Sequence, residues 1–284
     1  MSINSEEIYF INLKNIISFK NHPFQVREDE QMNMLTESVR SLGVLVPAIV
    51  RPLEGGKYEL ISGHRRKYAS ELIGLDVLPA IIRDVDYDEA TVMMVDSNFQ
   101  REEILPSERA KAYKMKLEAI KRQGMRTDLT SDQLGQKLKN KTSRDLIAEN
   151  SPDSSSQIQR YLRLNELIPE LLLMVDQKTI ALTPAAELSF LSKEEQRCLL
   201  SVIGLVQATP SLSQAQRMKR LSRNGRLTED TITEILLEQK KPECWNLAIP
   251  MNKITKYFPK SYSLQKMEEI IIQLLEDWRR KQRM

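Results

Sequence analysis

Cysteine, histidine and tryptophan are scarce in this 284-residue chain, which contains two of each. Cys198 and Cys244 lie far apart, so the sequence predicts neither a disulfide framework nor a cysteine-rich metal site. No run of about 18 apolar residues is present to span a membrane. The first nine residues carry two acids and no base, unlike a secretory signal. These absences predict a protein of the reducing cytoplasm that has no membrane partner.

Positive charge is distributed unevenly along the chain. Residues 109–144 contain 11 Lys or Arg and 3 acids, a net of +8; because the whole chain is +3, the rest carries −5. A second basic cluster has no acid between residues 214 and 226, and its members are Arg217, Lys219, Arg220, Arg223 and Arg226. A single run of this kind is often a solvated helix face. Two runs in an otherwise acidic chain favour a polyanionic partner, because phosphate contacts dominate nucleic-acid affinity.

Strand and helix patterns alternate over the first hundred residues. Met32, Leu35, Val39 and Leu42 recur at helical spacing, and Gly43 ends that helix. Strands are predicted over residues 47–51, 58–61 and 78–82, with further helices from residue 64 to Gly74 and over residues 89–96. We therefore expect an α+β domain over residues 1–104.

Strand patterns nearly disappear after residue 105, where Pro106, Ser107 and Glu108 suit the first turn of a helix. We expect an all-α domain over residues 105–203, a basic linker over 204–230 and a C-terminal helical region over 231–284. Residues at three-four spacing mark a helix in that last region: Leu264, Met267, Ile271, Leu274 and Trp278. This helix either packs on its own domain or pairs with a second subunit in a homodimer.

Residues 144–164 have the spacing of a helix-turn-helix. Ala148 is small enough for a helix crossing, and Ile158 and Tyr161 follow at the offsets of inward-facing positions. Ser154 and Gln157 fit the S-x-x-Q capping box of the second helix. A helical hairpin of another kind has similar spacing, but the adjoining basic segment favours DNA. Because Gln and Arg suit contacts with base edges, the predicted contacts to double-stranded DNA are Arg144, Ser155, Ser156, Gln157, Gln159, Arg160 and Arg163.

Two segments of the first domain carry groups that suit a phosphate. The strand that ends at Gly63 is followed at once by a basic helix start, His64-Arg65-Arg66, and helix N-termini attract phosphates. Residues 97–102 offer amide and guanidinium groups, and an Asn there can hold a magnesium ion that bridges phosphates. The alternatives are a solvated basic turn at Gly63 and helix capping by Asn98, with Arg101 paired to an acid.

The order of these blocks carries a resemblance. H-P-F-Q-V-R at 22–27, G-V-L-V-P at 43–47, G-H-R-R at 63–66 and S-N-F-Q-R-E at 97–102 are followed by Q-R-Y-L-R-L at 159–164. This series resembles the ParB family of chromosome and plasmid partition proteins over about residues 10–200. The resemblance implies a nucleoid-associated homodimer, a CTP-dependent clamp on DNA that works with a ParA-type ATPase.

The resemblance also implies a pocket for CTP and Mg²⁺. The residues that it places there are Gly63, His64, Arg65, Arg66, Asn98, Gln100 and Arg101, with Asn98 as the metal ligand. His64 stands where the family has Glu, and Ser97 stands where the family has a Glu implicated in hydrolysis. Asp96 is one position away, which on a helix turns a side chain by about 100°. CTP binding is therefore expected, and CTP hydrolysis and its catalytic residues are left open.

Other functions share this scaffold. A transcriptional or replication regulator without partition activity would have the same blocks, and a small-molecule kinase of ParB fold would not need the basic helical half. A redox enzyme of sulfiredoxin type needs a cysteine nucleophile just before the histidine, and Ser62 and Gly63 stand there instead.

Overall fold

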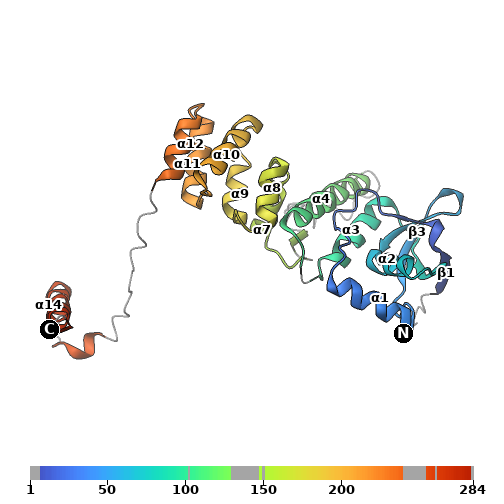
Figure 1. Ribbon diagram of the computed structural model, residues 1–284, viewed down its shortest axis with the longest axis horizontal. Coiled ribbons are helices and arrows are strands. Elements are labelled where there is room, and N and C mark those ends of the chain that lie inside the picture. Colours follow the sequence, from blue (N-terminus) through green and yellow to red (C-terminus); the bar gives the residue numbers. More distant parts are fainter. Residues whose placement is uncertain are drawn as a thin grey trace. The chain divides into compact units, whose positions relative to one another are not determined.

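The computed structural model describes residues 7–101, 103–128, 147–148, 151–238, 254–259 and 261–282 (Figure 1). The chain divides into two units, Met1–Leu237 and Glu238–Met284. Within the described residues, no helix is long and apolar enough to cross a membrane.

The first unit begins with a five-stranded sheet of order β1-β5-β3-β4-β2. The strands are β1 (Ile8–Asn12), β2 (Ile16–Ser18), β3 (Ala48–Pro52), β4 (Tyr58–Ser62) and β5 (Val77–Ile82), with short 3-10 turns at Leu13–Asn15 and Glu54–Gly56. β1–β5 and β3–β4 are antiparallel, whereas β3–β5 and β2–β4 are parallel. The three expected strands are confirmed. The edge strands β1 and β2 were missed, because each pairs with a strand more than 40 residues away.

Three helices accompany this sheet: α2 (His64–Leu72) and α3 (Tyr87–Asn98) contact its strands, and α1 (Glu30–Leu42) packs on α2. Side chains alternate across a strand, so the neighbours Leu60 and Ile61 of β4 enter different clusters. Leu60 packs with Val50 and Ala80, whereas Ile61 belongs to the core that contains Met94 of α3. The α+β fold expected for this region is therefore present.

In the part of the first unit that the structure describes, all further elements are helices. They are α4 (Pro106–Asp128), α7 (Ser155–Leu164), α8 (Pro169–Asp176), α9 (Leu182–Leu188), α10 (Lys193–Val206), α11 (Leu212–Arg223) and α12 (Glu229–Leu237). One hydrophobic core extends from Phe24 and Phe99 through Tyr113 to Ile235. Among the described residues, this core therefore joins the α+β region to the helices that follow it.

The expected linker over residues 204–230 is wrong for its central part. α11 begins at a full capping box, Ser211 with Gln214, and buries Ala215 and Met218. These side chains belong to the same core as α9 and α12. The polar, basic composition reflects only the outer face of a packed helix, and the compact unit continues to Leu237.

Part of the first basic run is also explained by internal packing. Arg109 pairs with Asp153 at 2.7 Å, Arg122 pairs with Asp88 at 2.8 Å, and Lys116 pairs with Asp96. These cations of α4 bind acids of neighbouring segments, so they do not contribute to a polyanion site. Residues 129–144 of the run lie outside the described residues.

The second unit contains a 3-10 turn (Thr255–Tyr257) and the helix α14 (Leu264–Gln282). The expected helix is confirmed. Met267 is buried, whereas Leu264, Leu274 and Trp278 are more than 60% exposed. A role for this face in a homodimer stays a prediction.

Candidate nucleotide pocket and DNA-reading helix

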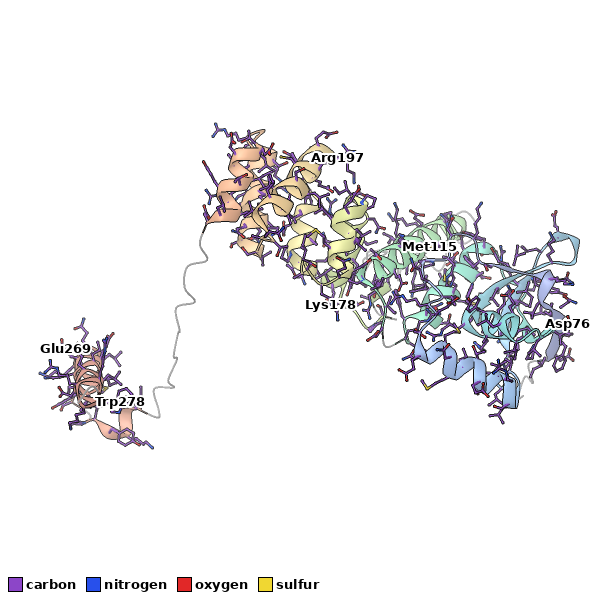
Figure 2. All side chains as sticks on the ribbon, in the orientation of Figure 1. Asp76, Met115, Lys178, Arg197, Glu269 and Trp278 are labelled. Atoms are coloured by element: carbon purple, nitrogen blue, oxygen red, sulfur yellow. The ribbon has the colours of Figure 1, made fainter. Side chains whose placement is uncertain are left out.

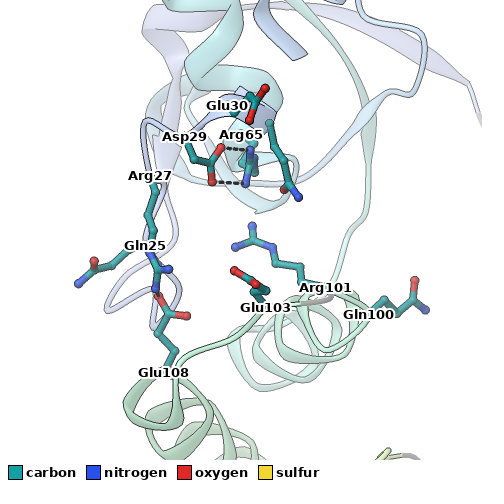
Figure 3. Close-up of a pocket in the computed structure, with 10 residues that line it drawn as sticks. Gln25, Arg27, Asp29, Glu30, Arg65, Gln100, Arg101, Glu103 and Glu108 are labelled. Atoms are coloured by element: carbon teal, nitrogen blue, oxygen red, sulfur yellow. Dashed lines mark hydrogen bonds and ion pairs between the residues drawn. The ribbon is translucent and has the colours of Figure 1, made fainter. Parts of the chain in front are cut away.

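A cavity of about 580 Å³ opens between the starts of α1 and α2 and the segment that follows α3 (Figure 3). This volume lies in the range of small-molecule sites. Three arginines stand out in the lining, Arg27, Arg65 and Arg101. The other lining residues are polar: Gln25, Asp29, Glu30, Gln31, Gln100, Glu103 and Glu108. With three arginines and four acids, the lining suits a charged or polar ligand better than an apolar one.

Gly63 makes the turn that starts α2. Its backbone has φ 107° and ψ 22°, a left-handed conformation that strains other residues. A Cβ at this position would lie 3.0 Å from the Ala48 Cβ. No side chain caps the helix, so the first backbone N–H groups of α2 stay available to an anion.

Arg65, in the first turn of α2, is held by the first turn of α1. Its Nη2 donates to Asp29 Oδ1 at 2.7 Å, and its Nη1 lies 3.4 Å from Oδ2. Asp29 also caps α1 by accepting from the Met32 N–H at 2.7 Å. These contacts lower the pKa of the Asp29 carboxyl, with the Arg65 hydrogen bond as the main cause. Arg65 is thus oriented before any ligand arrives.

Arg101 faces Arg65 from the opposite wall (Figure 3). Burial lowers the pKa of Arg101, and the positive charge of Arg65 lowers it further. Its guanidinium also lies 5.7 Å from the centre of the Phe24 ring. Two guanidiniums therefore face one pocket. Asp29 already offsets the charge of Arg65, and an anion between the two arginines would interact favourably with both.

Glu108 connects two segments that form one wall of the pocket. Its carboxylate accepts hydrogen bonds from the backbone N–H of Gln25 at 3.0 Å and of Leu105 at 3.1 Å. It also lies 3.5 Å from the Arg27 guanidinium. These bonds join the segment before α1 to the start of α4.

The other predicted nucleotide residues are not all in the cavity. Gln100 lines it, although its side chain points away from Arg101 in Figure 3. Arg66 does not line it; its Nη1 donates to the carbonyls of Val46 and Pro47, both at 2.6 Å. Asn98 is buried behind the wall, where its amide donates to the Met94 carbonyl at 2.8 Å. Arg66 therefore holds the backbone of Val46 and Pro47. A metal-binding role for Asn98 stays a prediction.

The ring of His64 lies against that of His22, with ring centres 3.7 Å apart and the two planes tilted by 35°. His22 Nδ1 lies 2.7 Å from the Phe24 carbonyl oxygen, which makes it the donor of that hydrogen bond. The Nε2 atoms of both rings are buried without a partner among the described residues. Burial lowers the pKa of His64 to about 3, so its ring is neutral at physiological pH.

Ser97 and Asp96 point to other partners. Ser97 Oγ donates to the Met94 carbonyl at 3.0 Å, and the Asp96 carboxylate is paired with Lys116 of α4. Asp96 is therefore not free to replace a catalytic carboxylate at position 97, as its helical offset suggested.

Sequence reasoning missed several pocket residues. Gln25 and Arg27 lie in the H-P-F-Q-V-R block, which signalled the region without assigning roles. Asp29, Glu103 and Glu108 had no signal as pocket residues. Asp29 and Glu108 are recognised only once their arginine partners, Arg65 and Arg27, are known, and Glu103 lines the cavity from the segment after α3.

Helix α7 has the form expected for the second helix of a helix-turn-helix. Ser154 caps it by accepting from the Gln157 N–H, and Ile158 and Tyr161 are buried. Ser156, Gln159 and Arg160 are exposed, and Ser155 and Gln157 are partly exposed. The preceding helix is described only at residues 147–148, and Arg144 lies outside the described residues.

Arg163, predicted to contact DNA, is engaged inside the protein. Its Nε donates to Ser189 Oγ at 2.9 Å and its Nη2 to the Ser189 carbonyl at 2.6 Å. Its guanidinium lies 3.8 Å from the centre of the Phe190 ring. The side chain therefore joins α7 to the end of α9.

No three His, Cys, Asp or Glu side chains gather as a metal-ligand set in the part of the chain that the structure describes. Magnesium on a nucleotide takes most of its ligands from phosphates and water, so it needs only one or two protein groups.

Comparisons with known proteins agree with this architecture. Residues 1–99 match the family model of the ParB N-terminal domain. Over 238 residues the chain is 30% identical to a nucleoid occlusion protein of Bacillus thuringiensis, an alignment that covers 84% of this chain and 70% of that protein. The chain belongs to the ParB family.

Other ParB-family proteins match over different lengths. A probable chromosome 1-partitioning protein ParB of Deinococcus radiodurans is 38% identical over 112 residues, which is 39% of this chain and 38% of that protein. A crystal structure of a C-terminally truncated ParB from Caulobacter crescentus, complexed to the centromeric parS site, has a TM-score of 0.46 and 20% identity. It covers 76% of this chain and 99% of that chain.

Proposed function

We propose that this ParB-family protein is a sequence-specific DNA-binding partition protein, a dimeric clamp on double-stranded DNA whose N-terminal domain binds CTP with Mg²⁺. The observation that carries the nucleotide part is the pair of guanidiniums, Arg65 and Arg101, facing each other across the cavity. A triphosphate between them would accept charge-assisted hydrogen bonds from both guanidiniums and use the uncapped N-terminus of α2.

We assign a separate role in nucleotide binding to each of several residues of the chain. Gly63 lets the backbone of the α2 start approach the phosphates, and Arg65 and Arg101 neutralise them. Arg66 holds residues 43–47 from behind, where the resemblance places the base. Bound Mg²⁺ would screen the phosphate charges, with Asn98 as the predicted ligand.

A nucleotide titration tests this proposal. Binding of CTP, ATP, GTP and UTP is measured with Mg²⁺, with and without DNA, on the wild type and on Arg65→Ala. We expect selective CTP binding that Arg65→Ala weakens at least about tenfold, since a charge-assisted pair contributes about 1.5–3 kcal/mol. Arg40→Ala, at an exposed arginine of α1, is the matched control and should bind like the wild type. Absence of binding to every nucleotide would contradict the nucleotide part.

Hydrolysis is proposed to be slow or absent. Ser97 cannot act as a base at neutral pH without a partner group, and its hydroxyl donates to a backbone carbonyl. Phosphate release should therefore be far slower than CTP exchange. Rapid turnover by the wild type would show that another residue performs the catalysis.

The proposed DNA-binding function is based on α7 and its exposed polar side chains, Ser156, Gln159 and Arg160. Two copies would be joined through α14, whose apolar residues are exposed in the single chain. Sedimentation of the full chain and of Leu274→Glu should give a dimer and a monomer, respectively. A ParA-type ATPase and the nucleoid are the proposed partner and location.

A second candidate is nucleoid occlusion or another regulatory role on the same scaffold. The alignment with a nucleoid occlusion protein covers 84% of the chain, whereas that with the Deinococcus partition protein covers 39%. Deletion of the gene separates the two. Loss of a chromosome or plasmid from dividing cells supports partition, and division across the nucleoid without such loss supports the second candidate.

A further inference from the structure

Phe190, just after α9, is surrounded by cations from two other helices. The Lys219 Nζ of α11 lies 3.5 Å from the ring centre, the Arg163 guanidinium of α7 lies 3.8 Å away, and the Arg223 guanidinium lies 5.9 Å away. The ring is nevertheless 43% exposed. A phenyl face attracts cations, so the ring gathers positive charge at one place on the surface. We call Arg163, Phe190, Lys219 and Arg223 the Phe190 cluster.

The positive charge extends beyond this cluster, along α11 and just after its end. Arg220 and Arg226 are exposed, and neither has an ion-pair partner in the described parts of the chain. Residues 214–226 contain no acid. The acid paired within the cluster is Glu187, which lies 2.6 Å from Lys219. The cations of α4 differ in this respect, because several of them pair with acids of other segments.

Two cations of the cluster, Arg163 and Lys219, are fixed by internal bonds. Arg223 of the cluster and the neighbouring Arg220 are exposed to solvent. Arg163 is held by Ser189, and Lys219 is held by Glu187. Arg220 and Arg223 are exposed on the same helix, three residues apart. Residues at this spacing are neighbours on a helix surface. The bonded pair thus gives a rigid base, and the exposed pair is able to reach a ligand.

The cluster is continuous with the helix proposed to read DNA. Arg163 is in α7, three residues after the exposed Arg160, and its guanidinium shares the Phe190 ring with α11. α9 lies between them and contacts both α7 and α11. The basic surface of α11 is therefore joined to the C-terminal end of α7 through a single aromatic side chain.

We propose that Arg220 and Arg223, the two exposed arginines of α11, bind the sugar-phosphate backbone of double-stranded DNA beside the groove that α7 enters, while the internally bonded Arg163 and Lys219 of the Phe190 cluster hold α11 in place. The inference rests on the proposed DNA-binding function and adds a second contact surface outside the helix-turn-helix. Like charges packed together favour a polyanion with regularly spaced phosphates. Phosphate contacts set register and strengthen binding without reading sequence, so α11 would strengthen all DNA binding equally.

The test measures how DNA affinity depends on salt. The wild type, the double variant Arg220→Ala/Arg223→Ala and the control Arg40→Ala are titrated with a random-sequence duplex and with duplexes that the wild type enriches from a random pool. Dissociation constants are determined at several KCl concentrations. Arg220→Lys/Arg223→Lys keeps the charge and separates charge from arginine geometry. Circular dichroism checks that each variant is folded.

We expect the Ala double variant to bind both duplexes about tenfold more weakly, with the slope of log K against log salt reduced by about 2, because each phosphate contact contributes about 0.9. The Lys double variant and Arg40→Ala should stay near the wild type. An unchanged slope and affinity in the Ala double variant would overturn the inference, and α11 would then suit an acidic protein partner. Equal weakening by Arg40→Ala would overturn it too, as a general charge effect. A wild type that binds no DNA would refute the proposed function itself.

Discussion

The phenol of Tyr113 in α4 donates a 2.6 Å hydrogen bond to Asp153, the residue just before the Ser154 cap of α7. Arg109, one turn earlier in α4, binds the same carboxylate oxygen at 2.7 Å. The Tyr113 ring also packs between Phe99 and Tyr161, at 4.6 and 5.9 Å between ring centres. One side chain of α4 thus joins the segment beside the nucleotide pocket to the proposed DNA-reading helix.

Tyr113→Phe should lower the free energy of unfolding by about 1–2 kcal/mol, because buried Asp153 loses a hydrogen bond and keeps its charge. Urea unfolding followed by circular dichroism measures this. Tyr9→Phe is the matched control, since the Tyr9 phenol is exposed and bonds to exposed Glu7. Equal stability of Tyr113→Phe and Tyr9→Phe would show that the Asp153 bond contributes little.

Gly63→Ala should destabilise the protein by about 1–3 kcal/mol and weaken nucleotide binding. The new alanine would have to keep a backbone φ of +107°, and its Cβ would lie only 3.0 Å from the Ala48 Cβ. Gly55→Ala meets a similar backbone conformation, φ +75°, but nothing within 4 Å. Its cost should be about 1 kcal/mol with unchanged nucleotide binding. Thermal unfolding and a CTP titration compare the two variants, and equal effects would rule out a special role for the Gly63 turn.

The two histidines make stability depend on pH. His64 has a pKa of about 3 in the folded protein and about 6.5 when unfolded. Below pH 6.5 the unfolded chain therefore binds more protons, so stability is fully present above that pH and is lost as the pH falls toward 3. The slope from this group is at most about 1.4 kcal/mol per pH unit. Urea midpoints between pH 7 and 4 should fall less steeply in His64→Gln than in the wild type; parallel curves would exclude His64 as the source.

Arg160→Ala should weaken binding to an enriched DNA site by about 1–3 kcal/mol and change binding to random DNA much less, because Arg160 is exposed on α7 and suits a base contact. Competition between the two duplexes at one salt concentration gives the ratio of affinities. Equal loss on both would make Arg160 a phosphate contact. Arg197→Ala, an exposed arginine of α10, is the control.

Local patterns in the sequence determined much of the fold. Spacing of apolar residues marked α1 and α14, turn residues bounded β3 and β4, and Ser154 marked the start of α7, because each signal depends on neighbours within one or two turns. The same applies to Gly63, whose position between a strand and a basic helix start pointed to a phosphate. The edge strands β1 and β2 had no such signal, since their partners are distant in sequence.

The uses of individual charges were decided only by the tertiary structure. Arg65 and Arg66 are adjacent and chemically alike, yet one enters the pocket beside Asp29 and the other binds the carbonyls of residues 46 and 47. The sequence predicted that the basic run in α4 faces DNA, but in the folded chain three of its cations pair with acids of other segments. The central part of the supposed linker is a packed helix, α11, which carries exposed cations on its outer face. A sequence records which charges a chain has, but Coulomb energy and desolvation depend on distance and burial, and only the packed structure sets those.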